Sequence, residues 1–163
     1  MTDDRDAAKN RLADSLDALD QTNSNRNALV CYDHAFRVSY YQTDGQRRVH
    51  HSHFINFFED ARVEMLRAAG ILYKDFEDAG RMLVVSQMNL EYHAAADFDD
   101  WLRVRVELTE VRKVRMKHRY TVYRDEPEDR EQTKIVTGQS VIACVDATGR
   151  PRKLPPQLLS ALS

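Results

Sequence analysis

The sequence predicts a single domain of the α+β class, in which an antiparallel sheet lies beside one main helix. One long helical pattern follows the first strand-like segment, and the later long segments alternate between apolar and polar residues as strands do. The 163 residues suit one domain with one hydrophobic core.

The chain divides at about residue 30. Residues 1–29 are polar and are expected to form a tail, although Leu12, Leu16 and Leu19 recur at a spacing that also suits a short amphipathic helix. The folded domain is expected over residues 30–163. Residues 34–43 are rich in Phe, Val and Tyr and predict the first strand, and the polar residues 44–48 end it as a loop.

The main helix is expected from Ser52 to about Ala69. Serine is a common N-terminal cap, and Gly70 is the residue type that ends helices. An apolar stripe is expected to face the core, with charged residues over much of the remaining surface. The stripe consists of Phe54, Phe57, Phe58, Ala61, Met65 and Leu66, and the charged residues are Glu59, Arg62 and Glu64.

The second half of the chain predicts strands. Residues 82–92, 101–111, 114–123 and 135–145 have strand patterns, and the second of these places Leu102, Val104, Val106 and Leu108 on one face. Short helices are expected over residues 73–79 and after Pro155 and Pro156.

Composition excludes several classes of protein. A formal net charge of −2 does not draw the whole molecule to nucleic acid, and no apolar run approaches the length of a membrane span. The first residues are acidic and lack the apolar region of a secretory signal. Cys31 and Cys144 are too few and too far apart for a disulfide framework. We therefore expect a cytoplasmic protein with two free thiols.

The segment before the main helix is the strongest candidate for chemistry. Asp44 ends a predicted strand, and a helix begins seven or eight residues later. Exposed backbone N–H groups at a helix start carry partial positive charge and can hold an oxyanion, while a carboxylate facing them can activate water or attack a carbonyl itself. The alternative is that Asp44 only forms a turn, which is the commoner role of an aspartate in a loop.

The same segment resembles the 4-hydroxybenzoyl-CoA thioesterase and Tol–Pal-associated acyl-CoA thioesterase families. Their loop reads roughly Tyr-x-x-Thr-Asp-x-x-Gly-x-Val-x-His-x-x-Tyr and precedes a helix with Phe-Phe-Glu-x-Ala-Arg. The present chain keeps Tyr40, Thr43, Asp44, Val49 and His51, and then the run from Phe57 to Arg62 without a gap. The likeness covers about residues 34–158.

The resemblance implies a hotdog fold, in which the sheet wraps around the long helix, and hydrolysis of an acyl-CoA to a free acid and coenzyme A. It implies that Asp44 is the catalytic carboxylate and that the His51 backbone N–H polarises the thioester carbonyl, while the His51 side chain positions the substrate or water or assists proton transfer. Tyr40 would line the pocket, with Ser52 beside it. No metal or organic cofactor is implied, and a homodimer or homotetramer is expected, with each site built from two chains.

Two departures from the family pattern concern glycines. Arg47 stands where the first motif has Gly, so the loop is expected to take another path if arginine avoids the glycine conformation. A second motif, Tyr-x-x-Pro-Ala-x-x-Gly-Asp, is present from Tyr92 to Asp100 with Ala95 in place of Pro and Asp99 in place of Gly. In the first motif His53 and Phe54 replace the usual Asn and Tyr.

A basic strand turn supplies candidate phosphate contacts. By alternation Lys113, Arg115 and Lys117 are expected to share one face, and Arg112 the other. The plain alternative is a solvated hairpin. We favour phosphate contact because an acyl-CoA has phosphates and cations at a turn can bind them.

Three other hypotheses use the same residues. His50, His51 and His53, with Asp44, suggest a metal site, but no known ligand spacing is present. A non-catalytic acyl-CoA-binding or scaffold protein on the same fold is the main alternative to an enzyme. A thioesterase acting on acyl-carrier protein is the third, since an acidic partner would also suit the basic turn.

Overall fold

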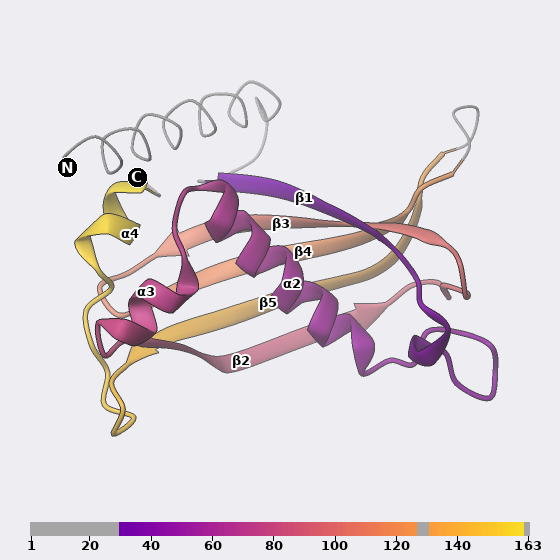
Figure 1. The fold of residues 1–163 in the computed structure, drawn as a ribbon. Coiled ribbons are helices and arrows are strands. Elements are labelled where there is room, and N and C mark those ends of the chain that lie inside the picture. Colours follow the sequence, from indigo (N-terminus) through magenta and orange to yellow (C-terminus); the bar gives the residue numbers. More distant parts are fainter. Residues whose placement is uncertain (1–29, 127–130, 162–163) are drawn as a thin grey trace.

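A computed structural model describes residues 30–126 and 131–161, and the expectations for residues 1–29 lie outside this range. Five antiparallel strands form one sheet in the order β1-β3-β4-β5-β2, and the helix α2 lies across one of its faces (Figure 1). The elements in chain order are β1 (Val30–Arg37), the 3₁₀ turn η1 (Tyr40–Gln42), α2 (His53–Ala68), α3 (Tyr73–Asp78), β2 (Met82–Tyr92), β3 (Trp101–Val111), β4 (Arg115–Arg124), β5 (Thr133–Val145) and α4 (Pro156–Ala161).

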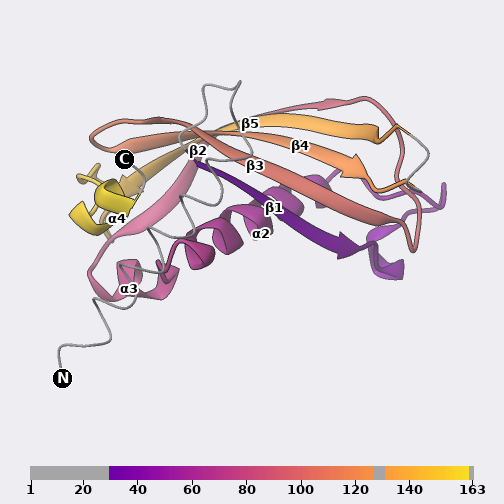
Figure 2. The ribbon, with the colours of Figure 1, turned by 90° about the horizontal axis from the view of Figure 1, so that it is seen from above.

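The predicted fold class is confirmed. Seen from above, α2 and α3 lie on the same side of the curved sheet (Figure 2). No helix in the described part of the chain is long and apolar enough to cross a membrane. Cys31 and Cys144 are both buried and are not joined in a disulfide.

The alternation in β3 and β4 builds the core. Leu102, Val104, Val106 and Leu108 are fully buried, as are Tyr120 and Val122 on the neighbouring strand. These side chains face α2, which packs over β1 and β3. The predicted apolar face is therefore the inner face of the sheet.

A close approach of α2 to the sheet occurs at Gly138 on β5. A Cβ atom there would lie 2.8 Å from Cζ of Phe58, so a larger residue would displace this ring. The Phe58 ring also stacks on Tyr120 with centroids 4.3 Å apart. One aromatic ring of the helix thus sits directly on the backbone of β5 and on a side chain of β4.

The ends of α2 agree only in part with the sequence. At its C-terminus Gly70 has φ of 74°, and bonds from Gly70 N to Arg67 O and from Ile71 N to Leu66 O close the helix as a glycine cap does. At its N-terminus the prediction for Ser52 is wrong, because its side chain makes no capping bond and its backbone is helical. Residues 40–42 form a 3₁₀ turn and not the end of the first strand.

A buried polar cluster lies between α2 and the sheet. Arg62 was expected on the helix surface, but only 8% of it is exposed, and its guanidinium donates to the Tyr120 hydroxyl at 3.3 Å. Tyr120 also bonds Ser140 at 2.8 Å. His118 is 1% exposed, and neither ring nitrogen has a hydrogen-bond partner in the described part of the chain.

This environment predicts an acid-sensitive fold. Burial, and then the charge of Arg62, lowers the pKa of His118 to about 3, whereas an unfolded histidine titrates near 6.5. Between these values the unfolded chain binds the extra proton, so the free energy of unfolding should fall as the pH falls from about 6.5 towards 3. In His118→Leu this decline should be shallower, measured by urea unfolding across the pH range.

The control is His93→Leu, which changes an exposed histidine. If His118→Leu keeps the full pH dependence of the parent, the buried imidazole is not a source of the acid sensitivity.

Candidate active site

Asp44 lies in a short hairpin between η1 and α2. Thr43 pairs with Val49, Asp44 N donates to Arg48 O at 3.0 Å, and Arg47 N donates to Asp44 O at 2.9 Å. One carboxylate oxygen of Asp44 accepts the Gln46 N–H at 2.8 Å. Asp44 therefore does form the turn that its residue type favours, and the bond leaves its second carboxylate oxygen without a protein partner in the described chain.

The hairpin keeps the glycine conformation although it lacks the glycine. Arg47 has φ of 62°, and Asp99 in the second motif has φ of 69°. These are the two positions at which the resembled families have Gly, and both are in the left-handed region that glycine enters most easily. The expected departure of the loop is therefore wrong, and the cost of the arginine appears as backbone strain.

The turn into α2 leaves one backbone donor unused. His50 N donates to Gln42 O at 2.9 Å and His53 N donates to His50 O at 3.0 Å. Ser52 N lies 3.3 Å from Nδ1 of His50. Within residues 30–126 and 131–161, no hydrogen bond has the His51 N–H as donor. The N–H group that the sequence singled out is thus the free one of this turn.

The second motif packs against the first, which sequence reasoning did not predict. The Tyr92 hydroxyl donates to the backbone oxygen of His51 at 3.1 Å, Val49 N donates to Ala96 O at 2.8 Å, and Arg48 pairs with Asp97. The only signal for this in the sequence was the incomplete motif itself. Together the two motifs form one end of the molecule, beside the start of α2 (Figure 1).

Tyr40, Ser52 and His51, the other residues predicted for the site, also lie at this end of the molecule. Tyr40 is 77% exposed, and its ring meets that of Phe98 edge to face at 5.6 Å. The Ser52 hydroxyl lies 2.8 Å from Nδ1 of His50, so it is engaged within the turn. His51 is exposed. No three His, Cys, Asp or Glu side chains in the described ranges are grouped as metal ligands.

The basic turn lies at the other end of the sheet in the same chain (Figure 1). Arg37 at the end of β1 pairs with Trp101 at the start of β3, so the Asp44 hairpin, which comes after β1, lies near that end of the sheet. Lys113 and Arg115 come just after Val111, at the opposite end of β3. The 11 residues of β3 span about 35 Å at the usual strand rise. Asp44 and the basic turn of one chain therefore do not share a site.

The expected facing of the basic residues is wrong as well. Arg112 and Lys117 both contact Glu110, at 2.6 Å and 3.0 Å, although alternation had assigned them to opposite faces. The reason is that Arg112 lies beyond the end of β3, in the turn, where the alternation of a strand no longer holds. These contacts lower the pKa of the Glu110 carboxyl to about 2.

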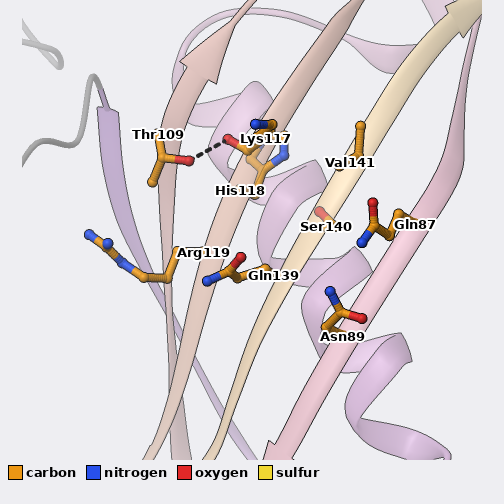
Figure 3. Close-up of a pocket in the computed structure, with 9 residues that line it drawn as sticks. All are labelled: Gln87, Asn89, Thr109, Lys117, His118, Arg119, Gln139, Ser140 and Val141. Carbon is orange, nitrogen blue, oxygen red and sulfur yellow. Dashed lines mark hydrogen bonds between the residues drawn. The ribbon is translucent and has the colours of Figure 1, made fainter.

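The hollow of about 250 Å³ described for this chain lies on the outer sheet face, away from α2 (Figure 3), and none of the residues that line it belongs to the Asp44 hairpin. Its lining is mainly polar and includes Gln87, Asn89, Lys117, Arg119 and Gln139.

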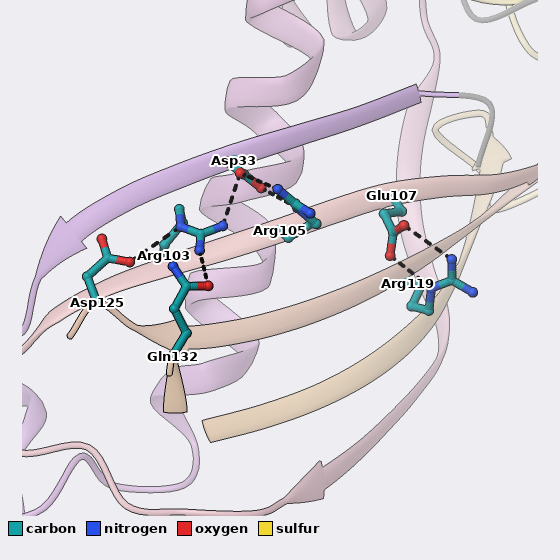
Figure 4. Close-up of polar contacts among 7 residues, drawn as sticks. All are labelled: Asp33, Arg103, Arg105, Glu107, Arg119, Asp125 and Gln132. Carbon is teal, nitrogen blue, oxygen red and sulfur yellow. Dashed lines mark hydrogen bonds and ion pairs between the residues drawn. The ribbon is translucent and has the colours of Figure 1, made fainter. Parts of the chain in front are cut away.

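Further along the same face a network of ion pairs crosses three strands (Figure 4). Asp33 on β1 bonds Arg105 at 2.8 Å and Arg103 at 3.1 Å on β3. Partial burial by itself raises the pKa of the Asp33 carboxyl, but the hydrogen bonds and charges of Arg105 and Arg103 leave it below its ordinary value. Glu107 on β3 bonds Arg119 on β4 at 2.9 Å. These arginines are already matched with carboxylates, so we assign them a structural role.

The fold and the helix-end site define a hotdog protein, and comparison with known proteins gives its family. Residues 38–162 match the model of the thioesterase-like superfamily. The chain belongs to this superfamily and is therefore a hotdog-fold thioesterase.

Individual relatives agree with this assignment. The Escherichia coli protein named acyl-CoA thioester hydrolase YbgC is 30% identical over 125 residues, which cover 76% of this chain and 90% of that protein. A crystal structure of a protein from Aquifex aeolicus has a TM-score of 0.73 and 29% identity, covering 81% of this chain and 99% of that one. The structure of a 4-hydroxybenzoyl-CoA thioesterase, at 14% identity, has a TM-score of 0.74 over 82% of this chain and 99% of that one, and shows the shared fold alone.

The strained arginine generates a stability prediction. A non-glycine residue in the left-handed region costs about 1–2 kcal/mol, and glycine itself costs about 0.5–1 kcal/mol of chain entropy. Arg47→Gly should therefore raise the free energy of unfolding by roughly 0.5–1 kcal/mol, measured by urea unfolding. The matched variant Arg48→Gly, at an exposed neighbour without positive φ, should lower it. Equal effects of the two changes would show that Arg47 is not strained.

Proposed function

We propose that this protein hydrolyses an acyl-CoA thioester, with Asp44 as general base or nucleophile and the His51 backbone N–H as oxyanion donor. The observation that carries the proposal is the pairing of a carboxylate with one unbonded oxygen and the free N–H of the next turn at the same end of the fold. Membership of the thioesterase-like superfamily and the name of the Escherichia coli relative support the reaction and the substrate class.

The chemistry follows from these two groups. A thioester carbonyl carbon is attacked by water that Asp44 deprotonates, or by the Asp44 carboxylate itself. The carbonyl oxygen becomes an oxyanion, which the His51 N–H stabilises. When the carbon–sulfur bond breaks, the sulfur leaves with coenzyme A as a thiolate that takes up a proton. In the nucleophilic route water then hydrolyses the resulting anhydride and restores Asp44.

The peptide that carries the donor is already polarised. The His51 N–H belongs to the peptide whose oxygen, His50 O, accepts the His53 N–H at 3.0 Å. A hydrogen bond to a carbonyl oxygen strengthens the donor at the other end of the same peptide. The exposed His51 side chain and Tyr40 are proposed to contact the acyl group or water, and Ser52 to bind substrate next to them.

We further propose a homodimer, and leave open the pairing of two dimers. The edge strand β2 has 11 residues and pairs only with β5 among the described strands. Val84 and Val85 on it are 39% and 46% exposed. A long open edge with exposed apolar residues favours pairing with another strand.

Antiparallel pairing of two β2 strands would also bring the predicted phosphate contacts to the site. Arg115 on β4 and Val84 on β2 both pair with Ala143 on β5, so they lie at the same height in the sheet. In the same way Val122, near the other end of β4, and Tyr92 both pair with Val136. A two-fold axis near the middle of β2 therefore places the Arg115 end of one chain beside the Tyr92 end of its partner. The basic turn, remote from Asp44 in its own chain, would then face the Asp44 of the other. For the compartment we propose the cytoplasm, in keeping with the two free cysteines.

Asp44→Asn should nearly abolish turnover and leave the fold intact. The amide oxygen of asparagine can still accept the Gln46 N–H, but it cannot act as base or nucleophile at this site. Release of free thiol from a panel of acyl-CoAs measures the loss, and circular dichroism and thermal unfolding check the fold. The control Asp97→Asn removes an exposed charge from the adjoining loop and should stay within a few-fold of the parent. Turnover in Asp44→Asn within a few-fold of the parent would remove Asp44 from the mechanism.

The basic turn should affect substrate binding only. Lys113→Ala with Lys117→Ala is expected to raise KM for acyl-CoA, most at low salt, and to leave kcat unchanged, because contacts to a remote part of the substrate are equal in ground and transition states. An acyl-N-acetylcysteamine, which lacks the nucleotide, should be hydrolysed equally by both proteins. The control Lys134→Ala changes an exposed lysine at the start of β5, at the other end of the sheet. A loss of kcat on both substrates would contradict the phosphate assignment.

A further inference from the structure

We propose that Tyr92 is a positioning residue, whose hydroxyl holds the turn before α2 and so keeps the His51 N–H oriented for a ligand. The inference rests on the proposed function, because it assigns a purpose to the same donor. It concerns a residue of the edge strand β2, which contributes no carboxylate or donor to the proposed chemistry.

The turn is held by bonds at each neighbouring position. Val49 and His50 donate to Ala96 and Gln42, and His53 donates to His50 O. Of these bonds, only the one to His50 O is made by the peptide that carries the His51 N–H. In the following peptide the Ser52 N–H lies 3.3 Å from Nδ1 of His50, and none of these bonds reaches its oxygen, His51 O.

Tyr92 supplies that missing contact. Its hydroxyl donates to His51 O at 3.1 Å, and His51 O lies one peptide beyond the free donor. The orientation of His51 is thereby set from both sides, because a residue's backbone direction depends on the two peptides that flank it. Without the hydroxyl the second peptide keeps only the contact of its Ser52 N–H with Nδ1 of His50, so the turn is held less firmly and the His51 N–H loses part of its preorganisation.

The ring and the hydroxyl of Tyr92 have separate roles. The ring meets Phe54, a residue 3% exposed in the first turn of α2, edge to face at 5.8 Å. Phenylalanine at position 92 would keep this contact and lose only the hydrogen bond. Tyr92 is itself 52% exposed, so removal of its hydroxyl leaves no buried polar group behind.

A matched control is present at the other end of the same strand. The Tyr73 hydroxyl, on α3, donates to Leu83 O of β2 at 3.2 Å and accepts the Leu83 N–H at 3.2 Å. Tyr73→Phe thus also removes the bonding of a tyrosine hydroxyl to a backbone segment, at the end of β2 remote from Asp44. Any effect that Tyr92→Phe has beyond Tyr73→Phe belongs to the position and not to the loss of a tyrosine hydroxyl.

The first test is kinetic and uses the full chain. Tyr92→Phe should lower kcat for acyl-CoA hydrolysis about tenfold with little change in KM, because a weakened oxyanion donor acts on the transition state. Its thermal midpoint should stay close to that of the parent, and Tyr73→Phe should keep the parent kcat. A parent-like kcat in Tyr92→Phe, or a fall no larger than that in Tyr73→Phe, would overturn the proposal.

The second test does not need activity. In a backbone amide NMR spectrum, Tyr92→Phe should shift or broaden the His51 resonance and those next to it, whereas Tyr73→Phe should leave them in place. An unchanged His51 resonance in Tyr92→Phe overturns the positioning role whatever the kinetics show. A parent protein that hydrolyses no thioester defeats the proposed function instead, and the amide spectrum still decides whether Tyr92 orients this turn.

Discussion

The contact of the Phe58 ring with Gly138 and Tyr120 is the constraint on which the arrangement depends. Because position 138 has no side chain, the ring rests on the backbone of β5 and stacks on Tyr120 from β4. This contact sets how closely α2 approaches the sheet at Phe58, and so contributes to the position of the first turn of the helix. Because protein interiors are packed as densely as organic crystals, the helix has little room to shift at this contact. The position of the site at the helix start therefore depends on a contact that lies more than one helical turn further along α2.

In that site most of the backbone groups named above are hydrogen-bonded, and a few polar groups are not. The hairpin of Asp44, the turn of His51 and the loop after Tyr92 bind one another through backbone hydrogen bonds. Among the described residues, the His51 N–H and one carboxylate oxygen of Asp44 make no hydrogen bond, and these are the two groups of the proposed chemistry. Arg47 and Asp99 hold left-handed conformations within these segments. Strain of this kind persists where surrounding bonds determine the backbone, and it is common at functional sites. Arg47 and Asp99 thus keep left-handed backbone conformations without being glycine.

The outer face of the sheet differs from the inner face in the kind of side chains that it carries. It carries ion pairs across β1, β3 and β4 and a polar hollow over β2, β4 and β5, whereas the inner face is apolar apart from the cluster around Arg62 and His118. Charged side chains are therefore paired with one another on the outer face, whereas on the inner face Arg62 is buried against the hydroxyl of Tyr120. Both β1 and β2 are edge strands in the described sheet, and β2 is the one whose exposed valines support the proposed pairing with a second copy.

The sequence by itself determined the class of fold and the alternating strands, and it singled out the segment around Asp44 as the candidate site. Alternation places Leu102, Val104, Val106 and Leu108 on one face because a strand repeats every two residues, and the helix of Phe57 and Phe58 follows from an equally local period. The tertiary structure alone decided the burial of Arg62, the bond from Tyr92 to His51 and the distance between Asp44 and the basic turn. Each of these depends on which distant segments pair and in what register, and short-range periodicity carries no information about that.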